Sequence, residues 1–213
     1  MTFKFPDSRI AVFAREPILG KVKTRLLAAL GEEGALALYQ QMLARIGSCI
    51  GTARLAQLDL WVTSNPSHES FLSICNEMNI YVQEGDELGE KMAFTCDQTL
   101  VTEAAQSMLI VGTDCPVMDA DYLEAALSSL QGDSDVVIGP AEDGGYVLIG
   151  MRQPQAALFA DISWGSERVL AETLARAKSL HLNYHLLPTL WDVDTPADLP
   201  RLQTLNPSLT HYS

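Results

Sequence analysis

The chain has 213 residues, of which 47% are hydrophobic, and its 27 acidic residues against 14 lysines and arginines give a formal net charge of −13. This length and composition predict a single folded domain over residues 1–213 with a full apolar core. The acidity argues against a nucleic-acid partner, because a phosphate backbone attracts basic surfaces. No apolar run reaches the roughly 18 residues that a membrane-spanning helix needs.

Short apolar runs alternate with helical patterns along the chain. The short runs are rich in β-branched and aromatic residues, as buried strands are. In the longer segments apolar residues recur every three or four positions, as on the buried face of a helix. In chain order we expect a strand at 9–14, helices at 22–30 and 33–46, a strand at 58–62, a helix from 71 to 78, a strand at 80–83, a helix that ends near 104, a strand at 108–112, a helix at 120–131, strands at 135–139 and 146–150, helices at 154–159 and 167–180, a strand at 183–188 and a short helix from 196.

This alternation predicts an α/β fold, a three-layer α/β/α sandwich with a mostly parallel sheet. Strands separated by helices pair in parallel through right-handed crossovers. The strands are apolar almost throughout, because both faces of a parallel sheet are buried. Such sheets bind ligands beyond the C-terminal ends of their strands, so we sought the functional residues directly after the predicted strands.

The cysteines and the first residues bear on the compartment. The four cysteines form neither a C-x-x-C pair nor a zinc-type spacing. We interpret them as reduced thiols of a cytoplasmic protein. The first ten residues lack the charged and apolar regions of a secretory signal. The sequence does not fix the oligomeric state, and a homodimer is compatible with it.

The segment FAREPILGKVKTRL, residues 13–26, places four basic side chains directly after the first strand. Free backbone N–H groups at the start of a helix favour an anion at this position. The segment has neither a Walker A loop nor a dinucleotide fingerprint, so basic side chains must take the part of a glycine-rich loop. A solvated helix face is the alternative, but we favour a phosphate site. Its candidate nucleotide-binding residues are Phe13, Ala14, Arg15, Gly20, Lys21, Lys23 and Arg25.

Three acidic residues near strand ends are candidate metal ligands. Asp114 follows the apolar strand MLIVG, where magnesium can combine one or two carboxylates with substrate phosphates. Its alternative role is a turn before the next helix. Asp192 and Asp194 alternate in WDVDTPADL, so in an extended segment both point to the same side. They repel each other unless a cation lies between them or one is protonated, although capping around Thr195 is an alternative.

The segment AEDGGY, residues 141–146, is a candidate for binding the second substrate. Two adjacent glycines let the backbone approach a ligand closely or adopt a positive φ. A plain hairpin turn explains the pattern nearly as well. Asp143 could orient an acceptor or act as a base, and Trp164 either lines a pocket or belongs to the core. The candidate substrate-binding residues are Gly144, Gly145, Tyr146 and Trp164.

Together, FAREPILGKVKTRLLAALG, GTDCP, GPAEDGGYVLIG and DVDTPADL resemble the bacterial glycosyltransferase-like proteins of the nucleotide-diphospho-sugar transferase superfamily, a group linked with arsenosugar biosynthesis. The resemblance extends from about Phe13 to Leu199. It implies a GT-A-like α/β/α sandwich that binds a nucleotide sugar with a divalent cation, Mg²⁺ or Mn²⁺.

The same motifs are similar to those of the 2-phospholactate guanylyltransferases. That resemblance implies metal ligation by Asp114, Asp192 and Asp194 and phosphate contacts from Arg15, Lys23 and Arg25. Many metal-dependent GT-A glycosyltransferases carry Asp-x-Asp after the central strand. Gly112-Thr113-Asp114 offers a single carboxylate there, which is closer to a nucleotidyltransferase.

We therefore predict a metal-dependent transferase that moves a sugar from a nucleotide-diphospho-sugar to a small acceptor, with Asp114 and Asp143 as catalytic candidates. In this reaction a cation stabilises the leaving nucleoside diphosphate. The alternative is nucleotidyl transfer, in which a phosphorylated substrate attacks the α-phosphorus of an NTP and pyrophosphate leaves. A non-catalytic nucleotide-binding module is a third hypothesis.

Overall fold

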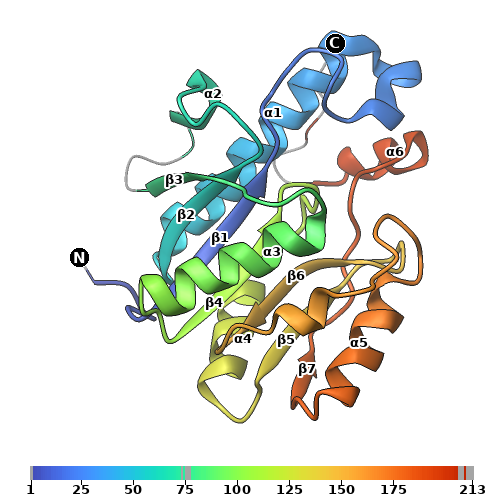
Figure 1. The fold of residues 1–213 in the computed structure, drawn as a ribbon. Helices are drawn as coiled ribbons and strands as arrows, with labels where there is room; N and C mark the ends of the chain where they lie inside the picture. The colour runs from blue at the N-terminus through green and yellow to red at the C-terminus, as the bar shows by residue number, and fades with distance from the viewer. Residues whose placement is uncertain (1, 73, 75–77, 206–208, 210–213) are drawn as a thin grey trace.

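The structure, a computed structural model, describes residues 2–72, 74, 78–205 and 209, and a seven-stranded sheet runs through its middle (Figure 1). The strands are β1 (Ser8–Ala14), β2 (Gln57–Val62), β3 (Met78–Val82), β4 (Ser107–Gly112), β5 (Val136–Pro140), β6 (Tyr146–Met151) and β7 (Tyr184–Leu186). Their order across the sheet is β3-β2-β1-β4-β6-β5-β7. Neighbours pair in parallel except around β6, which runs antiparallel to both β4 and β5.

Helices cover both faces of this sheet, which confirms the predicted three-layer α/β/α sandwich. One face packs against α1 (Leu27–Ala53) and α4 (Ala120–Gln131), and the other against α3 (Leu88–Asp97) and α5 (Val169–Ser179) (Figure 1). The shorter elements are α2 (Glu69–Leu72), α6 (Leu199–Leu202), the 3₁₀ turns η1 (Thr24–Leu26), η3 (Ala156–Phe159) and η4 (Pro196–Asp198), and the π-helical turn η2 (Gln98–Thr102). Among the described helices, none is both long and apolar enough to cross a membrane.

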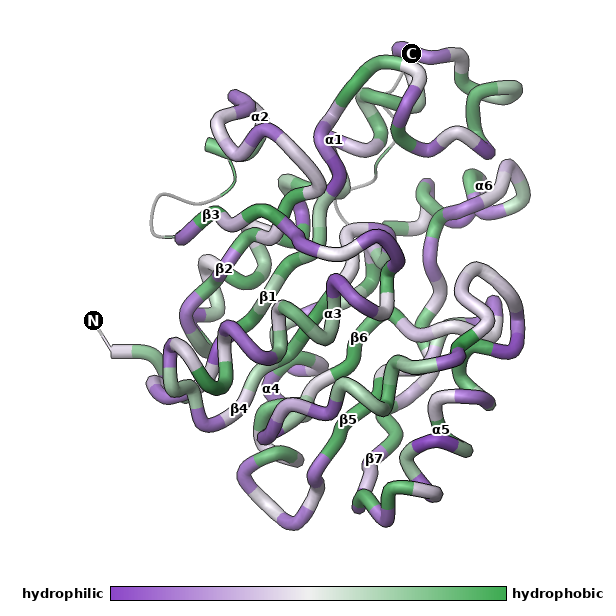
Figure 2. The backbone as a smooth tube through the Cα atoms, in the orientation of Figure 1, coloured by the Kyte–Doolittle hydropathy of each residue, from purple (hydrophilic) through white to green (hydrophobic). Residues whose placement is uncertain are grey.

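The central strands are buried from both sides, which explains their continuous apolar sequences. In β1, Ile10 and Val12 pack in the cluster under α1, whereas Ala11 between them packs in the cluster under α3. Figure 2 shows hydrophobic residues along the central strands and hydrophilic ones mainly in the surrounding loops. Burying one such aliphatic side chain contributes about 1.5–3 kcal/mol, so the core places the strand ends firmly.

The first helical region differs from the prediction at its end. The expected break at Gly31 is present, because its φ of 69° and ψ of 177° lie outside the helical range within α1. The helix then continues to Ala53 instead of stopping at Ile46. A Cβ on Gly47 would lie 1.9 Å from Ile74 Cγ2, so only glycine allows this packing. Glycines lower helix propensity, which is why the sequence pattern seemed to end there.

The second helical region was also predicted too long. Met78, expected in a helix, begins β3, and α2 ends at Leu72. The other residues of that prediction are Ile74, which lies in a turn, and 73 and 75–77, which lie outside the described residues. The expected start of the last helix is confirmed, since Thr195 and Asp198 form a capping box.

Candidate functional site

A cleft of about 800 Å³ opens beyond the C-terminal ends of the parallel strands β1, β2, β3 and β4. Its walls come from the loop after β1, from the ends of the other three strands and from the start of α3. Asp194, far along the chain, completes the lining. Sites for small molecules commonly measure about 300–1,000 Å³, so the cleft has room for one substrate or two.

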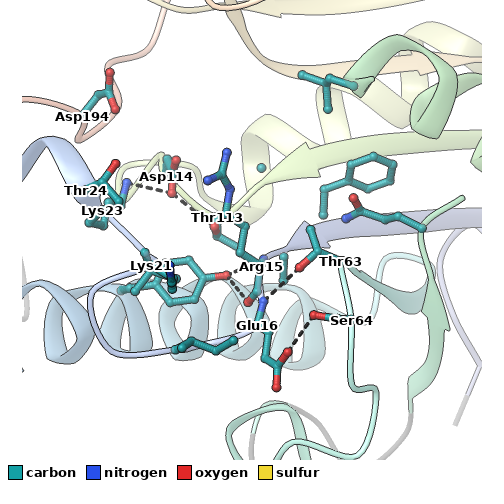
Figure 3. Close-up of a pocket in the computed structure, with 18 of the residues that line it drawn as sticks. Arg15, Glu16, Lys21, Lys23, Thr24, Thr63, Ser64, Thr113, Asp114 and Asp194 are labelled. Atoms are coloured by element: carbon teal, nitrogen blue, oxygen red, sulfur yellow. Dashed lines mark hydrogen bonds and ion pairs between the residues drawn. The ribbon is translucent and has the colours of Figure 1, made fainter. Parts of the chain in front are cut away.

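Tyr39 of α1 fixes the start of the loop after β1. Its hydroxyl accepts a hydrogen bond from Arg15 N at 2.7 Å and donates one to Arg15 O at 2.8 Å (Figure 3). Burial, and next the negative charge of Asp114, raise the pKa of Tyr39, so it stays a neutral donor. The backbone that presents Arg15 to the cleft is therefore anchored to a core helix. This role could not be predicted from the sequence, because Tyr39 fits the apolar spacing of α1.

Glu16 ties the same loop to the segment after β2. Its carboxylate accepts hydrogen bonds from Ser64 Oγ at 2.6 Å and Asn65 Nδ2 at 2.9 Å, and Glu16 N donates to Thr63 Oγ1 at 3.2 Å (Figure 3). These bonds lower the pKa of Glu16, so it is ionised at neutral pH. A lone Glu between basic residues gave no sequence signal for this function.

Lys23 reaches from this loop to two other segments. Its Nζ lies 2.8 Å from Asp114 Oδ1, at the end of β4 (Figure 3), and donates to Val193 O at 2.5 Å. Val193 N in turn donates to Asp114 O at 2.9 Å. Three segments distant in sequence therefore meet at one ammonium group, and only 4% of the Lys23 side chain is exposed.

A small hydrophobic cluster brings Arg25 and Asp194 together. Leu26 and Val193, the residues next to them, are both completely buried in a cluster with Leu38 of α1. The two charged side chains therefore emerge side by side, and they form an ion pair. Both are partly exposed, so the pair contributes little to stability.

Three further cations line the cleft. Within the part of the chain that the structure describes, no carboxylate lies at ion-pair distance from Arg15, Lys21 or Lys91. Arg15 and Lys21 belong to the loop after β1, whereas Lys91 comes from α3, which packs on the opposite sheet face from α1. Lys91 was not among the residues predicted for phosphate binding. The cleft thus presents uncompensated positive charge within a protein of net charge −13.

The acidic side of the cleft continues toward Asp192 and Asp143. Burial and the nearby carboxylates of Asp143 and Asp114 raise the pKa of Asp192 to about 6. Val193 is buried while its two neighbours are partly exposed, in line with the expected alternation. The described residues nevertheless contain no group of three or more His, Cys, Asp or Glu side chains arranged to hold a metal ion.

Comparison with known proteins places this chain in a family. Residues 48–166 match the model of a family described as "Uncharacterized protein conserved in bacteria (DUF2064)". The chain belongs to the DUF2064 family. A search of curated proteins gave no match.

Solved structures relate the DUF2064 fold to nucleotide-dependent enzymes. A "putative nucleotide-diphospho-sugar transferase" from Desulfovibrio desulfuricans G20 is 32% identical, with a TM-score of 0.81 over 89% of this chain and 83% of that one. A CMP:2-keto-3-deoxy-manno-octonic acid synthetase in complex with CTP is 12% identical, with a TM-score of 0.60 over 94% and 98%. A cytidylyltransferase from Leptospira borgpetersenii is also 12% identical, with a TM-score of 0.55 over 89% and 82%. The predicted relationship to the nucleotide-diphospho-sugar transferase superfamily is confirmed.

The structure brings most of the predicted phosphate-binding residues of the DUF2064 chain to the cleft. They are Phe13, Ala14, Arg15, Lys21, Lys23 and Arg25, joined there by Asp114 and Asp194. Gly20 does not line the cleft but turns the loop with a φ of 71°. Asp192 is not among the lining residues, but the negative charges of Asp114 and Asp194 act on it.

The residues predicted for the second substrate lie outside this lining. Gly144 has a φ of 89°, and a Cβ there would lie 2.2 Å from Glu167 O, so close packing already requires glycine. Asp143 accepts a hydrogen bond from Gly145 N at 2.8 Å. Tyr146 and Trp164 stack edge to face with their ring centres 6.3 Å apart, which gives both a packing role. The part of these residues in acceptor binding or catalysis stays a prediction.

Proposed function

We propose that this DUF2064 protein is a transferase that takes a nucleotide-diphospho-sugar as donor and passes the sugar to a small acceptor. The observation that carries the proposal is the charge of the cleft. Five cations and three carboxylates line it, although acidic residues outnumber basic ones by 27 to 14 in the whole chain. A diphosphate brings the negative charge that this cleft lacks. The name of the relative at 32% identity is consistent with this donor class.

Arg15, Lys21 and Lys91 are the residues that we assign to the phosphates. Because they have no ion-pair partner among the described residues, an anion that binds them breaks no existing pair. Arg15 can form two parallel hydrogen bonds to phosphate oxygens, whereas the lysines act as point charges. Their positions on the loop after β1 and on α3 support a phosphate site between these two segments.

Other residues of the cleft suit a nucleobase and sugar. Ile18 and Leu88 are each 44% exposed and line it, as does Phe13. Gln83 also lines it, and its Nε2 donates to Trp61 O at 2.8 Å. The side-chain oxygen of Gln83 can then accept a hydrogen bond from a bound base or sugar. Apolar surface with a few fixed polar groups is the usual lining of a base pocket.

A divalent cation would bind at the acidic end, on Asp114 and Asp194 with Asp192 close by. The donor set fits Mg²⁺ or Mn²⁺ in its chemistry, because these ions prefer carboxylate oxygens together with phosphates. Burial is the main cause of the raised pKa of Asp192, and the negative charges of Asp143 and Asp114 add to it. When bound, the ion would neutralise charge that develops on the leaving nucleoside diphosphate.

Nucleotidyl transfer is the second candidate, and one observation favours it. Only Asp114 follows β4, where many metal-dependent GT-A glycosyltransferases have two carboxylates. Here a phosphorylated substrate would attack the α-phosphorus of an NTP, a new P–O bond would form and pyrophosphate would leave.

Product analysis separates the two candidates. A thermal-shift screen of UDP- and GDP-sugars and of the four NTPs, with and without Mn²⁺, selects the bound donor. Incubation with a panel of sugar and phosphorylated acceptors, followed by ³¹P NMR, then identifies the leaving group. Release of nucleoside diphosphate supports glycosyl transfer, and release of pyrophosphate supports nucleotidyl transfer. Binding without turnover on any acceptor would favour a non-catalytic nucleotide-binding module, and no binding would contradict the proposal.

A further inference from the structure

The carboxylates assigned to the divalent cation already hold side-chain cations. Lys23 Nζ lies 2.8 Å from Asp114 Oδ1, and Arg25 is paired with Asp194. The described residues accordingly include no cluster of three acidic, histidine or cysteine side chains in a metal-holding arrangement. The site therefore fits a divalent cation in the chemistry of its donors but not in their present arrangement.

Lys23 is held in this position from several directions. Its side chain is 4% exposed, whereas that of Asp114 is 49% exposed, so the ammonium group is the enclosed partner of the pair. Its backbone has φ 49° and ψ 42°, a left-handed conformation that costs a non-glycine residue about 1–3 kcal/mol. The contacts of Nζ with Asp114 and Val193 O offset this strain. The pairing is therefore a feature of the fold and not a passing surface contact.

We propose that Lys23 is a positioning residue that takes the place of the divalent cation on Asp114 while the nucleotide is absent, and that Arg25 does the same on Asp194. This inference rests on the proposed function. Lys23 Nζ lies on Oδ1 of Asp114, and its positive charge repels a divalent ion that approaches the same carboxylate. The divalent ion therefore binds much more tightly when Lys23 turns away, and the phosphates of the donor are the new partner of Lys23.

Two consequences follow by linkage. The divalent cation binds weakly to the nucleotide-free protein, because it must first break the two ion pairs. Nucleotide and cation each strengthen the binding of the other by the same factor. Lys23 thus keeps Asp114 in place without a metal and delays assembly of the site until the donor arrives.

The test measures Mn²⁺ alone, without nucleotide, against the full chain by EPR of the unbound ion. Lys23→Met removes the charge but keeps the side-chain length, and we expect it to tighten Mn²⁺ binding about tenfold or more. Lys21→Met is the matched control, because it removes the same charge from the same loop and from a lysine without a carboxylate partner. The gain in Mn²⁺ affinity from Lys21→Met should stay below about threefold, because the charge of Lys21 acts on the ion only at a distance and is screened by salt. Lys23→Arg keeps the charge and should give no gain.

Equal gains in Mn²⁺ affinity from Lys23→Met and Lys21→Met would overturn the inference. So would an unchanged Mn²⁺ affinity in a folded Lys23→Met protein. If Lys23→Met does not fold by circular dichroism, Arg25→Gln decides, because that pair is exposed and its loss leaves the core intact. A gain supports the inference and its absence overturns it. The proposed function is tested separately, since wild-type protein that binds no nucleotide contradicts the function whatever the Mn²⁺ result.

Discussion

Asp59 offers a quantitative test of the structure through the pH dependence of stability. This residue lies in β2 with only 1% of its surface exposed. Asn79 Nδ2 donates to Asp59 Oδ1 at 2.9 Å, and Arg9 Nε lies 3.6 Å from Oδ2. Burial is the largest effect and raises the pKa of Asp59 from 3.8 to about 6. We predict that Asp59→Asn removes a pH-dependent loss of stability from the protein.

The sign and size follow from linkage. Between pH 4 and pH 6 the folded protein keeps the Asp59 proton that the unfolded chain has released, so the free energy of unfolding falls as pH rises. Each unit of pKa difference corresponds to about 1.4 kcal/mol, and the difference for Asp59 is about 2. The free energy of unfolding is therefore lowered by about 3 kcal/mol once Asp59 is ionised in the folded protein, above pH 6. Asn keeps an oxygen for the Asn79 bond and carries no charge. The stability difference between mutant and wild type should therefore rise by about 3 kcal/mol from pH 4 to pH 7.

Urea unfolding of both proteins at pH 4, 5, 6 and 7 measures this difference, and the contributions of carboxylates that do not interact with Asp59 cancel in it. Asp133→Asn, at an exposed position before β5, serves as the control and should show no such trend. A difference that stays constant across this range would refute the reasoning, because it would mean that Asp59 ionises in the fold as it does in the unfolded chain.

Two other substitutions test the site, and a third tests the packing of Gly144. Tyr39→Phe removes both bonds to the Arg15 backbone and should cost about 1–3 kcal/mol of stability and weaken nucleotide binding, measured by calorimetry; unchanged affinity would contradict the anchoring role. Lys91→Met should weaken binding of the nucleotide about tenfold, whereas Lys178→Met, on a lysine in the last turn of α5, should leave it unchanged, and equal losses would show a general charge effect. Gly144→Ala must displace the backbone at 2.2 Å and should cost more than about 2 kcal/mol in urea unfolding. Gly165→Ala, with a φ of 77° and nothing within 4 Å, pays for backbone strain alone; equal costs would contradict the steric argument.

Most of the fold could be predicted from the sequence, because the signals for its strands and helices are local. Apolar runs such as MLIVG indicate buried strands in an α/β chain. Capping residues such as Asp119 and Thr195 can be recognised in the sequence by their position before helices. Errors arose where tertiary contacts overrode the pattern. Gly47 looks like a helix end but is a packing contact with Ile74, and no local signal distinguishes the two.

The site was only partly predictable for a related reason. A cluster of basic residues after a strand points to an anion, which identified Arg15 and Lys21. The sequence does not say which cation faces which carboxylate, so the pairing of Lys23 with Asp114 could not be foreseen. Lys91 and Tyr39 reach the cleft only through the packing of α3 and α1. The spacing of residues along the sequence does not show which side chains of these helices reach the cleft.

The antiparallel strand β6 has an effect on how the protein can change over evolution. It separates the parallel strands β3, β2, β1 and β4 from β5 and from the edge strand β7. The lining of the cleft comes from residues 13 to 114, apart from Asp194. The turn between β5 and β6, residues 141–145, lies outside that lining. Substitutions at exposed positions of this turn can therefore alter one surface of the protein while the cleft keeps its lining.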